Sequence, residues 1–202
     1  MGRCSDARER LVATAVRLFR ERGYTAVSVA DICDAAALKK GSFYHFYASK
    51  LELALEAIDE YAKHYAELAK IGMREGVTAP MQLRAMLSAL QSSVTQSCAQ
   101  DGCARGCPIG NLALEMADRE EAIRRKIAAI FDQLKGAIEA IITRGIAAGE
   151  MPRVDPAQAA ESIVAMIQGA MVLTKTANDP RVMDRLMGGA MQTLLPAPQP
   201  TA

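Results

Sequence analysis

The segment that decides the fold reads KKGSFYHF and occupies residues 39–46. Phe43 and Phe46 stand three residues apart, so both can anchor a very short helix on an apolar core. The same helix then carries lysines, hydroxyls and an imidazole outward. Such groups neutralise phosphates and bond to phosphate oxygens or base edges of DNA. The DNA-contacting residues predicted in this segment are Lys39, Lys40, Ser42, Tyr44 and His45.

Two further predicted helices precede this segment. Apolar residues at helical spacing predict the first helix over residues 6–22. Ser28 begins the second helix as its N-cap, and Asp31, three residues on, can complete a capping box. Three short helices within forty residues, the last two joined by a tight turn, match a helix-turn-helix. Thr25, Ser28 and Lys50 are predicted to add phosphate contacts, because free N–H groups at helix N-termini attract anions.

Charge is unevenly distributed along the chain. The net charge is only +1, yet residues 1–50 hold nine Lys and Arg against five Asp and Glu, a balance of +4. Residues 51–202 hold fifteen against eighteen, a balance of −3. A polyanion would therefore dock at the basic N-terminal part.

The rest of the chain also predicts helices, and no window of useful length alternates as a strand does. Ala, Leu, Ile and Met are abundant, and unbranched side chains lose little rotamer freedom in a helix. The expected helices cover residues 49–71, 80–99, 109–117, a long stretch ending at 149, 155–178 and 179–194. The sequence thus predicts an all-α fold of about nine helices. It divides into a DNA-binding domain over residues 1–50, a ligand-binding and dimerisation domain over 51–195, and a disordered tail over 196–202.

Targeting signals and cysteine usage point to the cytoplasm. No uninterrupted apolar run precedes Arg8, so a secretory signal is not expected, and Asp6 stands where a myristoylation signal requires Ser or Thr. The most apolar stretch, residues 163–173, is too short to span a bilayer. Five cysteines, an odd number, favour reduced thiols over a disulfide framework. We expect a soluble cytoplasmic protein with no membrane partner.

The order and spacing of the N-terminal motifs resemble a known family. Residues 8–58 are similar to the DNA-binding domain of TetR-type repressors. The resemblance implies a ligand pocket from about residue 60 onward and a dimer in which the last two long helices pair across a two-fold axis. The matching stretches are Leu18-Phe19, Gly23-Tyr24, residues 27–32, residues 40–47 and Ser49-Lys50.

Two positions depart from the usual pattern of that family. Ala37 stands at the turn of the helix-turn-helix, where such proteins usually have Gly, and a left-handed Ala would cost about 1 kcal/mol. The pair Phe46-Tyr47 reverses the commoner Tyr-Phe order. This leaves open which ring packs inward and which hydroxyl meets phosphate.

Three cysteines, Cys98, Cys103 and Cys107, lie within ten residues. Three interpretations stay open: cysteines without a role, a metal site, and a reactive thiol. Three thiols at these gaps without a nearby His fit no zinc pattern well, and neither a metal nor a cofactor is predicted. Cys107 precedes a predicted helix, where free N–H groups and Arg105 favour the thiolate. Residues 106–113 also resemble a segment of a subset of TetR-type regulators, some of which respond to electrophiles or small unsaturated compounds. In the reactive-thiol interpretation, Cys107 is the favoured nucleophile and Cys103 or Cys98 is the candidate resolving partner.

These features predict a ligand-responsive transcriptional repressor and not an enzyme. A homodimer would bind a palindromic operator in double-stranded DNA, and a small-molecule effector or an electrophile would release it. Two other functions stay open: a thiol-based redox enzyme using Cys103 and Cys107, and a helical dimer that binds no DNA. Against the enzyme, neither His45 nor His64 is close in sequence to the cysteines.

Overall fold

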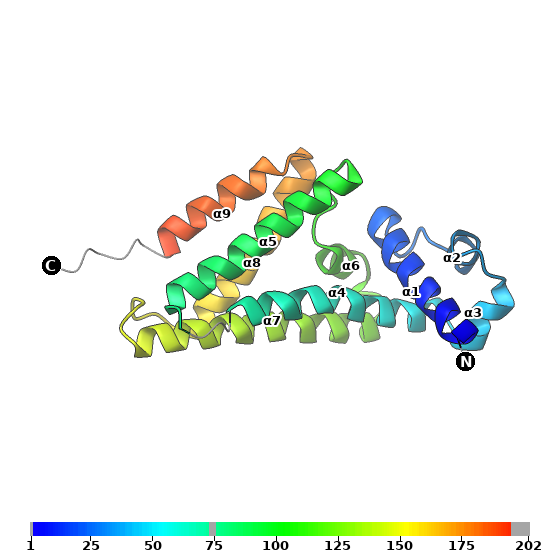
Figure 1. Ribbon diagram of the computed structural model, residues 1–202, viewed down its shortest axis with the longest axis horizontal. Helices are drawn as coiled ribbons and strands as arrows, with labels where there is room; N and C mark the ends of the chain where they lie inside the picture. The colour runs from blue at the N-terminus through cyan, green and yellow to red at the C-terminus, as the bar shows by residue number, and fades with distance from the viewer. Residues whose placement is uncertain (1, 73–75, 195–202) are drawn as a thin grey trace. The chain divides into compact units, whose positions relative to one another are not determined.

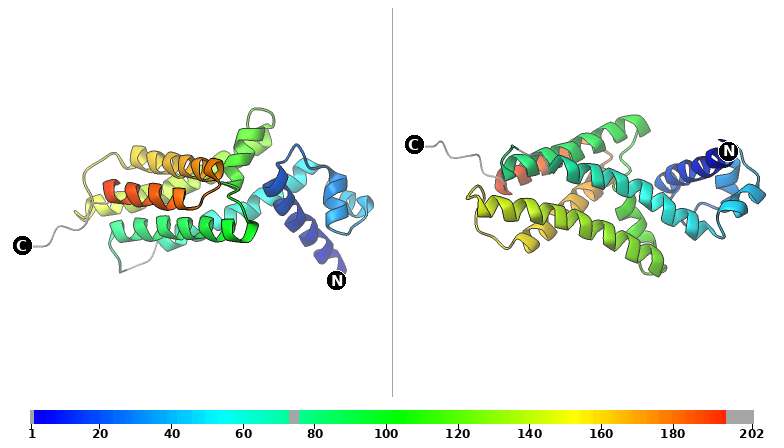
Figure 2. Two further views of the ribbon diagram at one scale, coloured as in Figure 1. Left: turned by 90° about the horizontal axis from the view of Figure 1, so that it is seen from above. Right: turned by 60° about the horizontal axis from the view of Figure 1, so that its bottom comes forward.

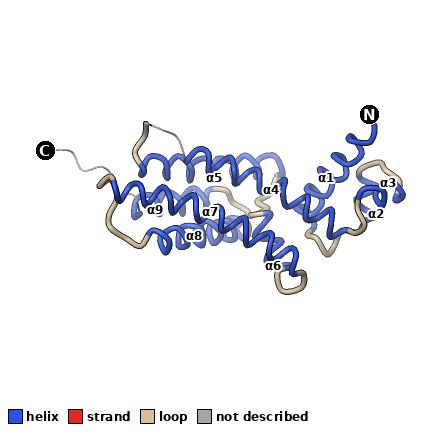
Figure 3. Tube along the Cα trace, turned by 90° about the horizontal axis from the view of Figure 1, so that it is seen from below, coloured by secondary structure: helices blue, strands red, loops and turns tan. Residues whose placement is uncertain are grey.

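The computed structural model describes residues 2–72 and 76–194. These residues form nine α-helices and no strand (Figures 1 and 3), which confirms the predicted all-α fold. The predicted disordered tail over residues 196–202 lies outside the described residues. The helices are α1 (Gly2–Arg22), α2 (Val29–Ala35), α3 (Lys40–Phe46), α4 (Lys50–Gly72), α5 (Ala79–Asp101), α6 (Pro108–Met116), α7 (Glu121–Ala147), α8 (Pro156–Ala177) and α9 (Arg181–Leu194).

Local capping signals set several helix ends. The Ser28 hydroxyl accepts the N–H of Asp31 at 3.1 Å, and the Asp31 carboxylate accepts the N–H of Ser28 at 2.8 Å, which confirms the predicted capping box of α2. Asp155 caps α8 by accepting two N–H groups from the first turn, where Pro156 needs no partner. The left-handed Asn178, at φ +49°, then ends the helix.

The contacts divide the chain into two compact units. The first runs to His64 and includes Pro108–Ile130; the second comprises Tyr65–Cys107 and the described residues from Phe131 onward. The domain boundary predicted at residue 50 stays a prediction, because a unit defined by contacts need not coincide with a domain that folds alone.

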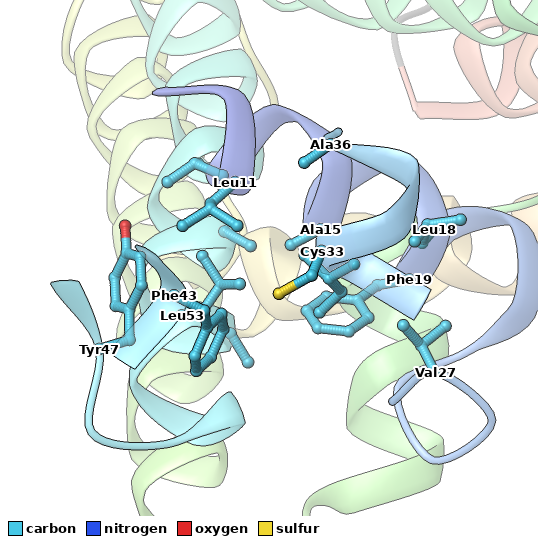
Figure 4. Packing of buried hydrophobic residues seen from close by; sticks show 14 residues of the cluster. Leu11, Ala15, Leu18, Phe19, Val27, Cys33, Ala36, Phe43, Tyr47 and Leu53 are labelled. Atoms are coloured by element: carbon cyan, nitrogen blue, oxygen red, sulfur yellow. The ribbon is translucent and has the colours of Figure 1, made fainter. Parts of the chain in front are cut away.

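One apolar core underlies α1, α2, α3 and the start of α4 in the first unit. Figure 4 shows the side chains of this cluster, with the ring of Phe43 beside Leu53. Leu11, Phe43 and Leu53 are fully buried, so each of three helices contributes a large side chain to the same core. Burial of this kind holds short helices in place, since α2 and α3 are too short to be stable alone.

The second unit packs α9 against α5 and α8, and Figure 2 shows these helices side by side. α8 is 22 residues long and contains an 18-residue window with a mean hydropathy of 1.2, so by length and composition alone it could cross a membrane. The sequence-based expectation of a span too short considered only residues 163–173, and the helix extends beyond them at both ends. α8 buries Ile163, Ile167 and Met171 within its unit, as a core helix of the same composition does.

Candidate nucleic-acid interface

The short helix α3 separates its side chains by polarity. Phe43 is fully buried, whereas Lys40, Tyr44 and His45 are exposed, with Tyr44 at 59%. Lys39, the N-cap residue, is exposed as well, and Ser42 is half-buried. The structure therefore brings the five predicted contact residues of this segment together on one helix and its cap. Their contact with DNA stays a prediction.

The aromatic pair at the end of α3 places its tyrosine inward. Tyr47 is 4% exposed, and its hydroxyl donates to Glu56 Oε2 at 2.8 Å. Arg8 Nη2 binds the same carboxylate oxygen at 2.9 Å. Burial, together with the neighbouring Glu56, raises the pKa of Tyr47 to about 12 against an opposing effect of Arg8. Phe46 is half-buried, and of the two tyrosines near the end of α3 it is Tyr44 whose side chain is exposed to solvent.

The turn between α2 and α3 holds a left-handed alanine. Ala37 has φ +51°, which confirms that the position usually filled by Gly needs a positive φ and that Ala strains it here. The Arg10 guanidinium donates to the carbonyl of Ala36 and, at 3.4 Å, to that of Ala37. Arg10 thus ties α1 to this turn over a separation of 26 residues.

The loop that joins α1 to α2 is bound by a carboxylate from α6. Glu115 accepts the backbone N–H of Tyr24 at 2.9 Å, the N–H of Thr25 at 2.7 Å and the Thr25 hydroxyl. Burial alone would raise the pKa of Glu115, but the hydrogen bonds from Thr25 and Tyr24 and the charge of Lys50 outweigh it and hold that pKa below its usual range. Thr25 was predicted to meet phosphate, and its backbone N–H and its hydroxyl both already have an acceptor.

Lys50, at the start of α4, binds the other polar groups of the same loop. Its ammonium group donates to the carbonyls of Tyr24 at 2.9 Å and Val27 at 2.8 Å, and lies 4.0 Å from the centroid of the Tyr24 ring. Burial lowers the pKa of Lys50, with Glu115 opposing. The phosphate contacts predicted for Thr25, Ser28 and Lys50 stay predictions, with intramolecular partners present for each.

The cysteine cluster lies in the second unit. Cys107 directly precedes α6 in the chain and is only 4% exposed. Its sulfur lies 2.8 Å from the hydroxyl oxygen of Tyr65, whose pKa is raised well above its usual value by burial first and then by Cys107. Arg105, expected to favour the thiolate, pairs with Asp101 at 3.5 Å, which compensates part of its charge.

The other two cysteines of the cluster differ in exposure. Cys98 is buried and Cys103 is intermediate, and each of the thiols at positions 33, 98, 103 and 107 is free of a disulfide. Among the described residues, no group of three His, Cys, Asp or Glu side chains is arranged to hold a metal ion.

Comparison with known proteins decides the family. One model, of the bacterial regulatory proteins of the TetR family, matches residues 11–57, and a second, of the tetracyclin repressor-like C-terminal domain, matches residues 79–189. The chain belongs to the TetR family.

Relatives and a solved structure agree with this TetR-family assignment. An uncharacterised HTH-type transcriptional regulator of Lactococcus lactis is 30% identical over 183 residues, which cover 89% of this chain and 88% of the relative. The HTH-type transcriptional repressor DhaR of a Mycobacterium species is 26% identical, with 96% and 94% covered. A crystal structure of a TetR transcriptional regulator from Chloroflexus aurantiacus is 28% identical, covers 97% of this chain and 98% of its own, and superposes with a TM-score of 0.85.

The resemblance seen in residues 8–58 is thereby confirmed, and the TetR-family relatives are transcriptional regulators. Sequence reasoning missed the contacts that Glu115, Glu56 and Arg10 make within the first unit. Each contacts a residue far along the chain, with separations of 90, 48 and 26 positions. No local pattern marks such a contact, so only the fold reveals it.

Proposed function

We propose that this TetR-family chain is a transcriptional repressor that binds a palindromic DNA operator as a homodimer and is released by a small molecule or an electrophile. The observation that carries the proposal is the exposed polar face of α3 over the buried ring of Phe43. A rigidly anchored helix with outward cations is what the second helix of a helix-turn-helix presents to the major groove.

The proposed contacts differ in kind. Lys40, Tyr44 and His45 reach base edges or phosphates from α3, with Lys39 and Ser42 beside them. Lys50 uses two donors on carbonyls, so the third of its three N–H groups can meet a phosphate. The two other predicted contacts, Thr25 and Ser28, already donate to carboxylates within the protein and would have to share or release those bonds.

A second copy of the chain is the proposed occupant of the apolar surface on α8. Val172 is 49% exposed and Leu173 53% exposed, and Leu186 on α9 is 38% exposed. Exposed apolar side chains on adjacent helices suit a two-fold interface, and TetR-family regulators are usually dimers. Ile167 and Met171, on the same helix, are buried in the protomer's own core, so they are poor probes of the dimer.

The effector is proposed to act through the second unit. The Tyr65 hydroxyl can donate to a thiolate at Cys107, which offsets part of the cost of charging a buried thiol. Burial of that thiol restricts it to reagents small enough to enter the unit. Cys103 or Cys98 is the proposed resolving partner. A repressor of this kind works in the cytoplasm, where it meets the chromosome.

The test begins with DNA that wild-type protein enriches from a random duplex library. We expect an enriched palindrome, bound at least about 1000-fold more tightly than a shuffled duplex at physiological salt, and a dimer in sedimentation. Leu173→Glu should weaken the dimer and operator binding together, whereas Gln133→Glu, which adds the same charge at an exposed position of α7, should alter neither. Failure to enrich any sequence would contradict the proposed function. Binding of a monomer to the palindrome would contradict the proposed dimer.

A further inference from the structure

The contact between α6 and the loop before α2 joins segments 90 residues apart in the chain. Both lie in the first unit. The Glu115 carboxylate accepts two consecutive backbone N–H groups and one hydroxyl, at 2.9 and 2.7 Å for the N–H groups. Charge-assisted hydrogen bonds of this kind are about twice as strong as neutral ones, so this contact is a substantial constraint on the loop.

Backbone geometry allows the carboxylate to come this close. Gly23 has φ +85°, and a Cβ added there would lie 3.0 Å from Glu115 Oε2. A side chain at position 23 would therefore meet both a strained backbone conformation and the carboxylate. The loop can bind Glu115 because its first residue is a glycine.

The loop is held by opposite charges on its two kinds of polar group. Glu115 binds the N–H groups of Tyr24 and Thr25, while Lys50 binds the carbonyls of Tyr24 and Val27. Ser28, the N-cap of α2, follows directly. A loop fixed at both its donors and its acceptors fixes where α2 begins.

The position of α2 determines the position of α3, the helix that is proposed to face DNA. α2 packs against α3 and also against α1, and buried Ile32 belongs to the same core cluster as Phe43. Protein interiors are close-packed, so a small displacement of one buried side chain displaces its neighbours. A shift at the start of α2 therefore moves the exposed side chains of α3.

We propose that Glu115 is a positioning residue for operator binding: through Tyr24 and Thr25 it sets the place of α2 and hence of α3, without touching DNA. This inference rests on the proposed function, since it requires that α3 read an operator. It also gives Thr25 an indirect role in place of the phosphate contact predicted from the sequence.

Removal of the Glu115 carboxylate has two effects on operator affinity, and they act in opposite directions. Glu115→Gln deletes one negative charge from the DNA-binding unit, which by itself strengthens binding to a polyanion. It also replaces one of the two acceptor oxygens by an NH2 donor that faces an N–H group, and it removes the charge that strengthens the bonds to the remaining oxygen. The amide therefore holds the loop less firmly than the carboxylate does. A loss of operator affinity in this variant can therefore come only from displaced structure.

The experiment measures binding of Glu115→Gln to the library-enriched duplex and to its shuffled version. The matched control is Asp118→Asn, the same loss of charge three residues along, at a side chain that is 80% exposed. We expect operator affinity to fall about tenfold, or ~1.4 kcal/mol, while affinity for the shuffled duplex stays level or rises. Amide hydrogen exchange should accelerate in the peptide covering residues 23–28, and Asp118→Asn should show neither effect.

Thr25→Val supplies a second, milder variant that keeps the fold. If Thr25 acts through Glu115, its substitution should cost about threefold in operator affinity in wild type and clearly less in Glu115→Gln, because both changes weaken the same contact. Operator affinity of Glu115→Gln equal to that of Asp118→Asn, or additive losses in the double variant, would overturn the inference while leaving the proposed function intact. A wild-type protein that binds no enriched duplex would overturn both.

Discussion

Helix α3, which is proposed to read DNA, and the region around Cys107 differ in where they place their polar side chains. On α3, Lys40 and Tyr44 are exposed and stand over a fully buried ring. In the second unit, Cys107 and Tyr65 are both buried, with sulfur and oxygen 2.8 Å apart. Exposed donors can contact a macromolecule such as DNA, whereas buried polar groups are accessible only to a small molecule. This difference supports the assignment of DNA to the first unit and of the effector to the second.

The largest expected effect comes from removing the support of α3. Phe43→Ala should destabilise the protein by about 3–5 kcal/mol, because it empties the centre of the core of the first unit. Urea unfolding measures the loss. Tyr44→Ala, the adjacent and exposed position, should stay within about 0.5 kcal/mol of wild type while it weakens operator binding. Equal unfolding midpoints for the two variants would contradict the buried role of Phe43.

A second prediction concerns access to the buried thiol. A bulky maleimide should label Cys103 at least about tenfold faster than Cys107, because Cys107 becomes accessible only when the structure opens locally. Iodoacetamide, which is smaller, should label the two cysteines at more similar rates. In urea, where the protein is unfolded, the two rates should be equal. Site-resolved mass spectrometry follows both rates. Faster labelling of Cys107 by the bulky reagent would show an open thiol and erase the contrast with α3.

A smaller effect is expected at a single cation of α3. Lys40→Ala should reduce operator affinity about fivefold and lower the slope of log affinity against log salt by about 1. Lys63→Ala removes an exposed lysine of α4 that pairs with Glu60 at 2.6 Å and should leave the slope unchanged. Identical salt slopes for the two variants would show that Lys40 does not contact a DNA phosphate.

The smallest predicted effect is a gain in stability at the turn that orients α3. Ala37→Gly should raise the free energy of unfolding by up to about 1 kcal/mol, because Gly adopts φ +51° without the Cβ penalty. Ala35→Gly, two residues earlier and helical, should lower it by about 0.5–1 kcal/mol. Thermal unfolding of both variants measures the two changes in stability. A loss of stability in both variants would exclude backbone strain at Ala37.

Sequence patterns predicted the elements whose causes are local. The bounds of α3, the capping box of Ser28 and Asp31, and the anchoring of Phe43 depend on residues at most four apart, so one short stretch contains the cause. The strained turn at Ala37 was also predictable, because a known backbone requirement met the wrong residue there.

Burial and long-range pairing were not predictable in the same way. The sequence placed Cys107 at the start of a helix, but it could not show that Tyr65 covers the thiol from 42 residues away. It also assigned Thr25 to phosphate, since an exposed threonine near a helix start has the same local pattern whether its acceptor is DNA or Glu115. The acceptor became visible only when α6 was in place.

The carboxylate of Glu115 also limits how modular the DNA-binding end is. A chimaera that joins residues 1–50 to the body of another regulator would carry α3 and Lys50 but leave α6 behind. Its Tyr24 and Thr25 N–H groups would face whatever side chain the new body presents at the corresponding place. If Glu115 positions α3 as proposed, a transplant of operator specificity would need Glu115, or an acidic residue at its position in the recipient, to accompany the helix-turn-helix.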